Sequence, residues 1–185
     1  MGSVRVKLAI GVAVLGVAVT TAAAVAGDRG KLRTSLGGYE EVPAVSTAGY
    51  GSFKASLAGG GTELRYELRY ADLEGGNPTQ AHIHFGQKSV NGGVSVWLCG
   101  SAANPGPAGT QACPASAGGR VTGTITAAQV GGPAAQGIAA TELDELVDAL
   151  RAGIAYANVH TATYPGGEIR GQLDDDRRRR GRDDR

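Results

Sequence analysis

The sequence predicts an all-β domain, an antiparallel Greek-key β-sandwich of about eight short strands with one short α-helix. Short runs in which apolar and polar residues alternate recur along the chain, as in strands that bury one face. Glycine is abundant, 31 of 185 residues, and falls between these runs without a collagen-like period. A chain of this length is expected to build one hydrophobic core.

The predicted strands are short and are bounded by Gly, Pro and Asn. The clearest covers residues 63–70, where charged residues at odd positions alternate with Leu or Tyr at even positions. It follows the turn Gly59-Gly60-Gly61, so we expect a hairpin with the strand at 52–57. The other predicted strands are 35–42, 81–85, 94–99, 120–126, 154–161 and 168–173.

One segment has helical spacing instead. Thr141 is the predicted N-cap, and Gly153 the residue that ends the helix. Between them an apolar stripe recurs at i, i+3, i+4 and i+7: Leu143, Leu146, Val147 and Leu150. We expect this helix to cover one end of the β core.

The N-terminal segment, residues 1–26, is typical of a secretory signal peptide. Arg5 and Lys7 precede an uncharged apolar run that ends in Ala24-Val25-Ala26, the small-x-small pattern of a cleavage site. The run is also close to the roughly 20 residues that span a bilayer, so an uncleaved anchor is the alternative. The Ala-x-Ala pattern favours cleavage after Ala26, hence a secreted or extracytoplasmic protein without stable membrane insertion.

Residues 27–34 are predicted to be a linker, 35–173 the domain and 174–185 a disordered charged tail. The tail holds only Arg, Asp and one Gly, and cannot supply a core. Its arginine run resembles a nucleic-acid patch, but the flanking aspartates nearly cancel the charge. Over the whole chain 18 basic and 17 acidic residues balance, so no nucleic-acid partner is expected.

Cys99 and Cys113, the only two cysteines, are predicted to form one disulfide, as fits an oxidising compartment. A two-cysteine metal site would favour closer spacing with further ligands nearby, and a catalytic thiol would leave the second cysteine unexplained. The predicted bond would tie down a long loop of small residues between Gly100 and Gly119.

All three histidines lie in two short motifs, His82 and His84 in Ala-His-Ile-His-Phe-Gly and His160 in Tyr-Ala-Asn-Val-His-Thr. On a strand, His82 and His84 project from the same face about 6.5 Å apart. If the two strands are neighbours, His160 joins them, and three neutral imidazoles would suit Zn²⁺ or Cu²⁺. Asn158, Glu168 and Arg170 are candidates for residues that surround such an ion. The alternative is that the histidines are structural and bind loop carbonyls.

Several motifs together resemble the CHRD family, over most of residues 36–173. They are Glu40-Glu41-Val42-Pro43, the His-x-His strand, Asn91-Gly92 and, most specifically, the block from Tyr156 to Leu173 with Pro165-Gly166-Gly167-Glu168. The family is named after chordin, an extracellular antagonist of secreted growth factors, and occurs in exported bacterial proteins of no settled activity. The resemblance implies an extracellular location and leaves the activity open.

The two histidine strands also look like those of copper/zinc superoxide dismutases, so the expected sandwich is superoxide-dismutase-like or immunoglobulin-like. This is an analogy of fold and site. The chain has no fourth histidine, which excludes the two-metal site and leaves a copper-only variant. An enzyme would be a copper-dependent oxidoreductase of that type, but binding without catalysis is the preferred hypothesis.

Two functions therefore remain from the sequence. One is a metal-binding module that holds copper or zinc at His82, His84 and His160. The other is a non-catalytic adhesion or interaction module without a cofactor, in which the histidines are structural and a surface meets an extracellular protein or cell-surface partner.

Overall fold

The computed structural model describes residues 31–175, and its strands form a single eight-stranded antiparallel sheet. The all-β prediction with eight strands and one short α-helix is confirmed. The predicted signal peptide and residues 176–185 of the predicted tail lie outside the described residues. In chain order the strands are β1 (Lys31–Gly37), β2 (Tyr50–Ala58), β3 (Glu63–Ala71), β4 (Pro78–Phe85), β5 (Gly93–Gly100), β6 (Gly119–Ile125), β7 (Ala155–Thr161) and β8 (Ile169–Asp175).

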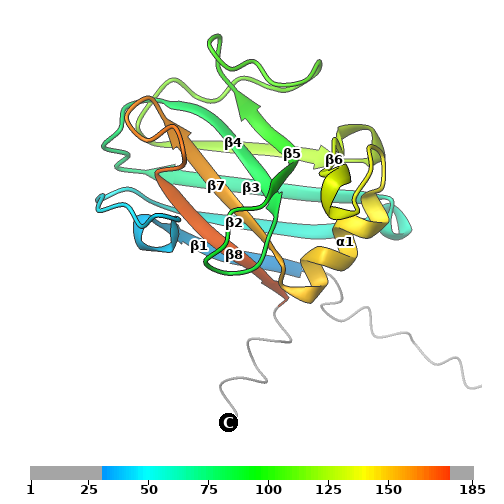
Figure 1. Ribbon diagram of the computed structural model, residues 1–185. Coiled ribbons are helices and arrows are strands. Elements are labelled where there is room, and N and C mark those ends of the chain that lie inside the picture. Colours follow the sequence, from blue (N-terminus) through cyan, green and yellow to red (C-terminus); the bar gives the residue numbers. More distant parts are fainter. Residues whose placement is uncertain (1–30, 176–185) are drawn as a thin grey trace, which may run out of the picture.

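The strand order across the sheet is β5-β4-β7-β8-β1-β2-β3-β6, and the sheet bends over on itself. Strands β4, β7 and β8 cross those of the other half, β1, β2 and β3, and the edge strands β5 and β6 touch (Figure 1). One continuous sheet thus forms both layers of a nearly closed barrel. The core lies between the layers, with Phe53 and Leu68 from one half and Ile83 and Ile169 from the other, all fully buried.

Strand β1 differs from the prediction. It starts at Lys31, inside the segment predicted as linker, and ends at Gly37, where the predicted strand 35–42 would continue. Leu32, Thr34 and Leu36 point inward, while Lys31, Arg33 and Ser35 are exposed. Pairing with both β2 and β8 sets this register, whereas the residues after Gly37 form a 3₁₀ turn.

Helix α1 (Leu143–Ala152) packs against β7 and β8 at one end of the sheet, and its predicted apolar stripe is buried (Figure 1). Gly153 adopts a left-handed conformation and donates its N–H to the carbonyls of Ala149 and Leu150, as predicted for the C-terminus. The predicted N-cap is wrong, because Thr141 has φ of 72° and the helix starts without a side-chain cap. In residues 31–175 no helix is long and apolar enough to cross a membrane.

The predicted disulfide is confirmed, with Cys99 and Cys113 joined across Cα atoms 4.9 Å apart. It ties the long loop between β5 and β6 back onto the end of β5. Two backbone hydrogen bonds help, from Gly100 N–H to the Gln111 carbonyl at 2.9 Å and from Cys113 N–H to the Gly100 carbonyl at 2.7 Å. The loop also approaches Trp97 so closely at Gly106 that any side chain there would meet the indole ring.

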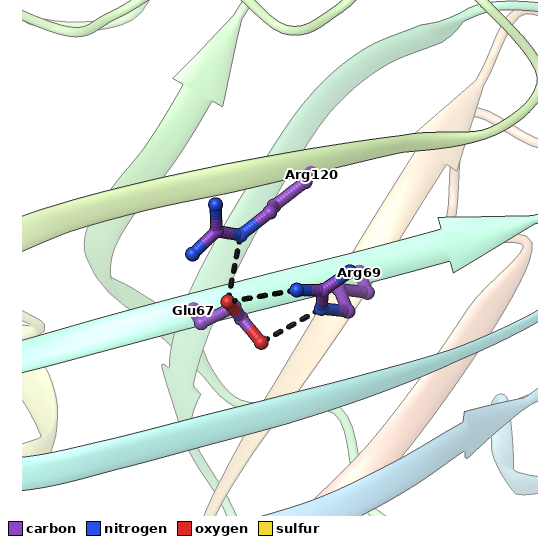
Figure 2. A network of polar contacts seen from close by, with 3 residues as sticks. All are labelled: Glu67, Arg69 and Arg120. Carbon is purple, nitrogen blue, oxygen red and sulfur yellow. Dashed lines mark hydrogen bonds and ion pairs between the residues drawn. The ribbon is translucent and has the colours of Figure 1, made fainter.

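The outer face of β3 and β6 carries an exposed ion-pair network (Figure 2). The Glu67 carboxylate accepts hydrogen bonds from Arg69 Nε and Arg120 Nε, both at 2.7 Å. The two arginines lower the pKa of Glu67 from 4.5 to about 2. The network is solvated, so its contribution to folding is small.

Candidate metal centre

Two neighbouring strands carry the three histidines. His82 and His84 lie on β4 and His160 on β7, and these strands are adjacent and antiparallel, as the sequence hypothesis required. In the register, His82 is opposite Asn158 and Gln80 is opposite His160. Ala81 and Ile83, on the other face of β4, are fully buried in the core, which fixes the histidines on the opposite face.

The three imidazoles form a compact buried group, called the His triad below. Their candidate ligand atoms all lie within 4.8 Å of one another. The residues His82, His84 and His160 are 3%, 8% and 6% exposed. Strand pairing alone therefore brings together three side chains separated by up to 78 positions in the chain.

Backbone carbonyls select the tautomer of two rings. His84 Nδ1–H donates to the Gly92 carbonyl and His160 Nδ1–H to the Pro165 carbonyl, each at 2.9 Å. The Nε2 atoms of both rings are then free of a proton, the form in which histidine binds metals. His160 Nε2 accepts a hydrogen bond from His82 Nδ1 at 3.1 Å. The Nε2 atoms of His82 and His84 are buried and have no hydrogen-bond partner among the described residues.

Burial also keeps the triad neutral. It lowers the pKa of His82 from 6.5 to about 2, with a further contribution from the other two histidines. It lowers the pKa of His84 to about 4, against the opposing effect of the hydrogen bond to Gly92, and it lowers the pKa of His160. The lowered pKa values favour the neutral form of all three imidazoles, which is the protonation state that can bind a metal.

Two aromatic rings enclose the His triad. Trp97 on β5 meets His82 edge to face, with ring centroids 4.3 Å apart. Tyr156 on β7 stacks flat on His84, at 4.6 Å and an interplanar angle of 3°. These two ring contacts restrict the orientations of the His82 and His84 imidazoles.

Arg170 lies on the far side of Tyr156. Its guanidinium carbon is 3.3 Å from the centroid of that ring, so Arg170, Tyr156 and His84 form one continuous stack. The side chain is 1% exposed and donates to the carbonyls of Gln87 and Val90 and to Asn91 Oδ1. A full positive charge is therefore fixed one ring away from the triad.

Glu41 is a buried carboxyl group near Arg170. Burial raises the pKa of Glu41 to about 7, against the opposing charge of Arg170, and its Oε1 has no partner among the described residues. Gly167, with φ of 128°, packs so closely that any side chain there would collide with this carboxyl group.

The other predicted neighbours of the site lie in different places. Asn158 is 2% exposed and lies beside His84, with its Oδ1 unpartnered within residues 31–175. Glu168 is fully buried, and its partners are Thr47, Thr161 and the N–H groups of Glu74 and Gly75. Glu168 and Arg170 each bind a separate set of groups.

Sequence reasoning missed Trp97 and Glu41 as neighbours of the site. Trp97 is opposite His82 across β4 and β5, and no local pattern shows that pairing. The only available signal was that Trp97 is the single tryptophan of the chain, on a strand next to the His-x-His strand. Glu41 lies in the Glu40-Glu41-Val42-Pro43 motif, whose residue types do not indicate that its carboxyl group is buried.

The fold and site define a small all-β domain with a disulfide and a buried histidine cluster. The chain belongs to the CHRD family, because the CHRD domain matches residues 32–173. Searches of curated proteins and of solved structures found no match. The family relationship therefore agrees with the resemblance seen in the sequence, and the properties of the His triad must be argued from its own geometry.

The residues of the triad fit a metal ion with nitrogen ligands. Two buried Nε2 atoms without partners are costly in an apolar setting, and an ion would compensate them. Neutral imidazoles suit zinc and copper, whereas calcium and magnesium favour oxygen ligands. The hydrogen bonds from Nδ1 to carbonyls are the outer contacts that usually orient metal-binding histidines.

Proposed function

We propose that this CHRD domain is an extracytoplasmic metal-binding module in which His82, His84 and His160 hold one copper or zinc ion. The observation that carries the proposal is the convergence of three buried neutral imidazoles with ligand atoms within 4.8 Å. Binding would replace the hydrogen bond between His82 and His160. Export is supported by the leader-like N-terminal segment, the family and the disulfide.

The fluorescence of Trp97 can report metal binding, because Trp97 is the only tryptophan of the chain and its ring contacts His82. We expect stoichiometric Cu²⁺ to quench the fluorescence of the tag-free mature protein, and Zn²⁺ to compete with it. Either His82→Ala or His160→Ala should abolish the effect, because each removes one of three ligands. Glu63→Gln, which removes a partly exposed carboxylate from the outer face, is the matched control and should leave the titration unchanged. Quenching that survives both histidine substitutions would contradict the proposal.

A second candidate is a non-catalytic interaction module with structural histidines. The observation in its favour is that each ring already has a hydrogen bond to the protein, at 3.1 Å or less. Tyr39 and Tyr50, 82% and 57% exposed, would then belong to a surface that meets an extracellular protein or cell-surface partner. This candidate predicts that Cu²⁺, Zn²⁺ and chelators leave the unfolding midpoint unchanged, whereas an ion at 100 times its Kd stabilises by about 2.7 kcal/mol.

A superoxide-dismutase-type activity would require copper in the same triad. The three histidine residues are at most 8% exposed, which restricts the approach of a substrate, so we propose binding rather than catalysis. Superoxide consumption by the copper-loaded protein above that of His160→Ala would contradict this assignment.

A further inference from the structure

We infer that the His triad selects a monovalent ion, Cu⁺, over the divalent ions Cu²⁺ and Zn²⁺. The inference rests on the proposed metal site and adds the oxidation state of its ligand. It follows from the charges around the triad, from burial, and from the position of Arg170.

The ligand set carries no negative charge. Its three members are imidazoles, and among the described residues no carboxylate belongs to the cluster. The buried carboxylate of Glu168 accepts four hydrogen bonds, and none of them comes from a histidine of the triad. Glu41 interacts electrostatically with Arg170 and Tyr156. A bound ion would therefore keep its whole charge inside the protein.

Burial penalises that charge steeply. The free energy needed to move an ion from water into a medium of low dielectric constant grows with the square of its charge. Desolvation of a divalent ion therefore costs about four times as much as desolvation of a monovalent ion of equal size. Sites for divalent ions usually offset this cost with anionic ligands or with water in an open position. The triad is enclosed by Trp97 and Tyr156 and supplies only neutral donors.

Arg170 adds to the selectivity. Its guanidinium group is stacked on Tyr156, which is stacked on His84, and three hydrogen bonds prevent it from turning away. Repulsion between a fixed cation and a bound ion doubles when the charge of the ion doubles, and burial weakens the screening by salt. Arg170 thus disfavours Cu²⁺ and Zn²⁺ more than Cu⁺.

The test compares four ions on the tag-free mature protein, by competition with chelators of known affinity. The ions are Ag⁺ as a monovalent probe that needs no reductant, Cu⁺ under anaerobic conditions, Cu²⁺ and Zn²⁺. We expect Ag⁺ and Cu⁺ to bind at least 100-fold more tightly than Zn²⁺, and Cu⁺ more tightly than Cu²⁺. Equal or tighter binding of Cu²⁺ would overturn the inference and leave the metal site standing. Binding of none of the four would overturn the metal site as well.

Variants at position 170 isolate the effect of charge. Arg170→Gln should reduce the preference for Cu⁺ over Cu²⁺ about tenfold, which corresponds to a Cu²⁺/Cu⁺ potential lower by about 59 mV. Arg170→Lys keeps the charge and should retain most of the preference. Lys88→Gln removes an exposed charge from the loop that Arg170 holds, and should change nothing. If Arg170→Gln and Arg170→Lys change the preference for Cu⁺ over Cu²⁺ equally, the charge of Arg170 is not the cause of that preference. If Arg170→Gln does not fold, the affinities of the wild-type protein for the four ions still decide whether the triad prefers Cu⁺.

Discussion

Glu168 provides the sharpest test of how this fold is held together. Its carboxylate is fully buried, and each oxygen accepts two hydrogen bonds. Oε1 accepts from Thr47 Oγ1 at 2.8 Å and from Glu74 N–H at 2.7 Å. Oε2 accepts from Gly75 N–H at 3.0 Å and from Thr161 Oγ1 at 2.8 Å. Four donors thus converge on one anion and tie two loops to the end of β7.

The four donors around the Glu168 carboxylate are called the anion cage below. The substitution Glu168→Gln replaces the carboxylate at its centre by an amide of nearly the same volume. The new NH₂ group must face one hydroxyl and one backbone N–H whichever way the amide turns. The hydroxyl can rotate and accept, but the backbone N–H is left buried without a partner. Loss of that bond and of the charge on the remaining acceptor should destabilise the domain by about 2–4 kcal/mol.

Urea unfolding of the wild-type and variant proteins measures this difference. Glu142→Gln is the matched control, because the Glu142 carboxylate accepts a single backbone hydrogen bond, from Ala139, that glutamine can replace. We expect that variant to lie within about 0.5 kcal/mol of wild type. A Glu168→Gln variant equally close to wild type would refute the view that the four bonds form a stabilising anion cage.

Three further predictions follow from other residues. Burial raises the pKa of Glu41 from 4.5 to about 7, so the folded state holds this proton more tightly than the unfolded state. The contribution of the protonated carboxyl group to the free energy of unfolding is complete below pH 4.5 and is lost as the pH rises through 7. Wild type should therefore lose about 2–3 kcal/mol relative to Glu41→Gln between pH 4.5 and 8 in urea unfolding, and parallel curves would contradict this. Replacing Cys99 and Cys113 together by Ala should cost about 3 kcal/mol through the lost loop constraint, and an unchanged unfolding midpoint would rule that out. The Glu67 carboxyl should titrate near pH 2 by NMR and move toward its usual 4.5 in Arg120→Gln or at high salt, whereas a midpoint insensitive to both would show that the arginines are not the cause.

Much of the fold could be predicted because strand patterns are local. The alternation of charged and apolar residues identified β3 almost residue for residue, and the spacing of Leu143, Leu146, Val147 and Leu150 identified α1. The prediction of a strand at 35–42 instead of β1 (Lys31–Gly37) was wrong because the local pattern is weak there. Its alternating residues are few and follow the leader-like segment, so only pairing with β2 and β8 reveals them as a strand.

The candidate site could be predicted only in part. The period of two along β4 placed His82 and His84 on one face without any tertiary information. Their meeting with His160 required β7 to lie beside β4, which depends on the burial pattern of the whole chain and not on either motif. The same dependence explains why the sequence could not show that the Glu168 carboxylate faces Thr47 and Thr161.

The sequence by itself determined the all-β class, the disulfide, the family and the three candidate ligands, because each depends on residue types and on short-range periodicity. Only the tertiary structure decided that the sheet is continuous, that the ligands converge, and that Trp97, Tyr156 and Arg170 surround them. The physical reason is that the pleat of a strand sets the direction of its side chains locally, whereas the choice of neighbouring strand is made by the burial of all apolar faces at once.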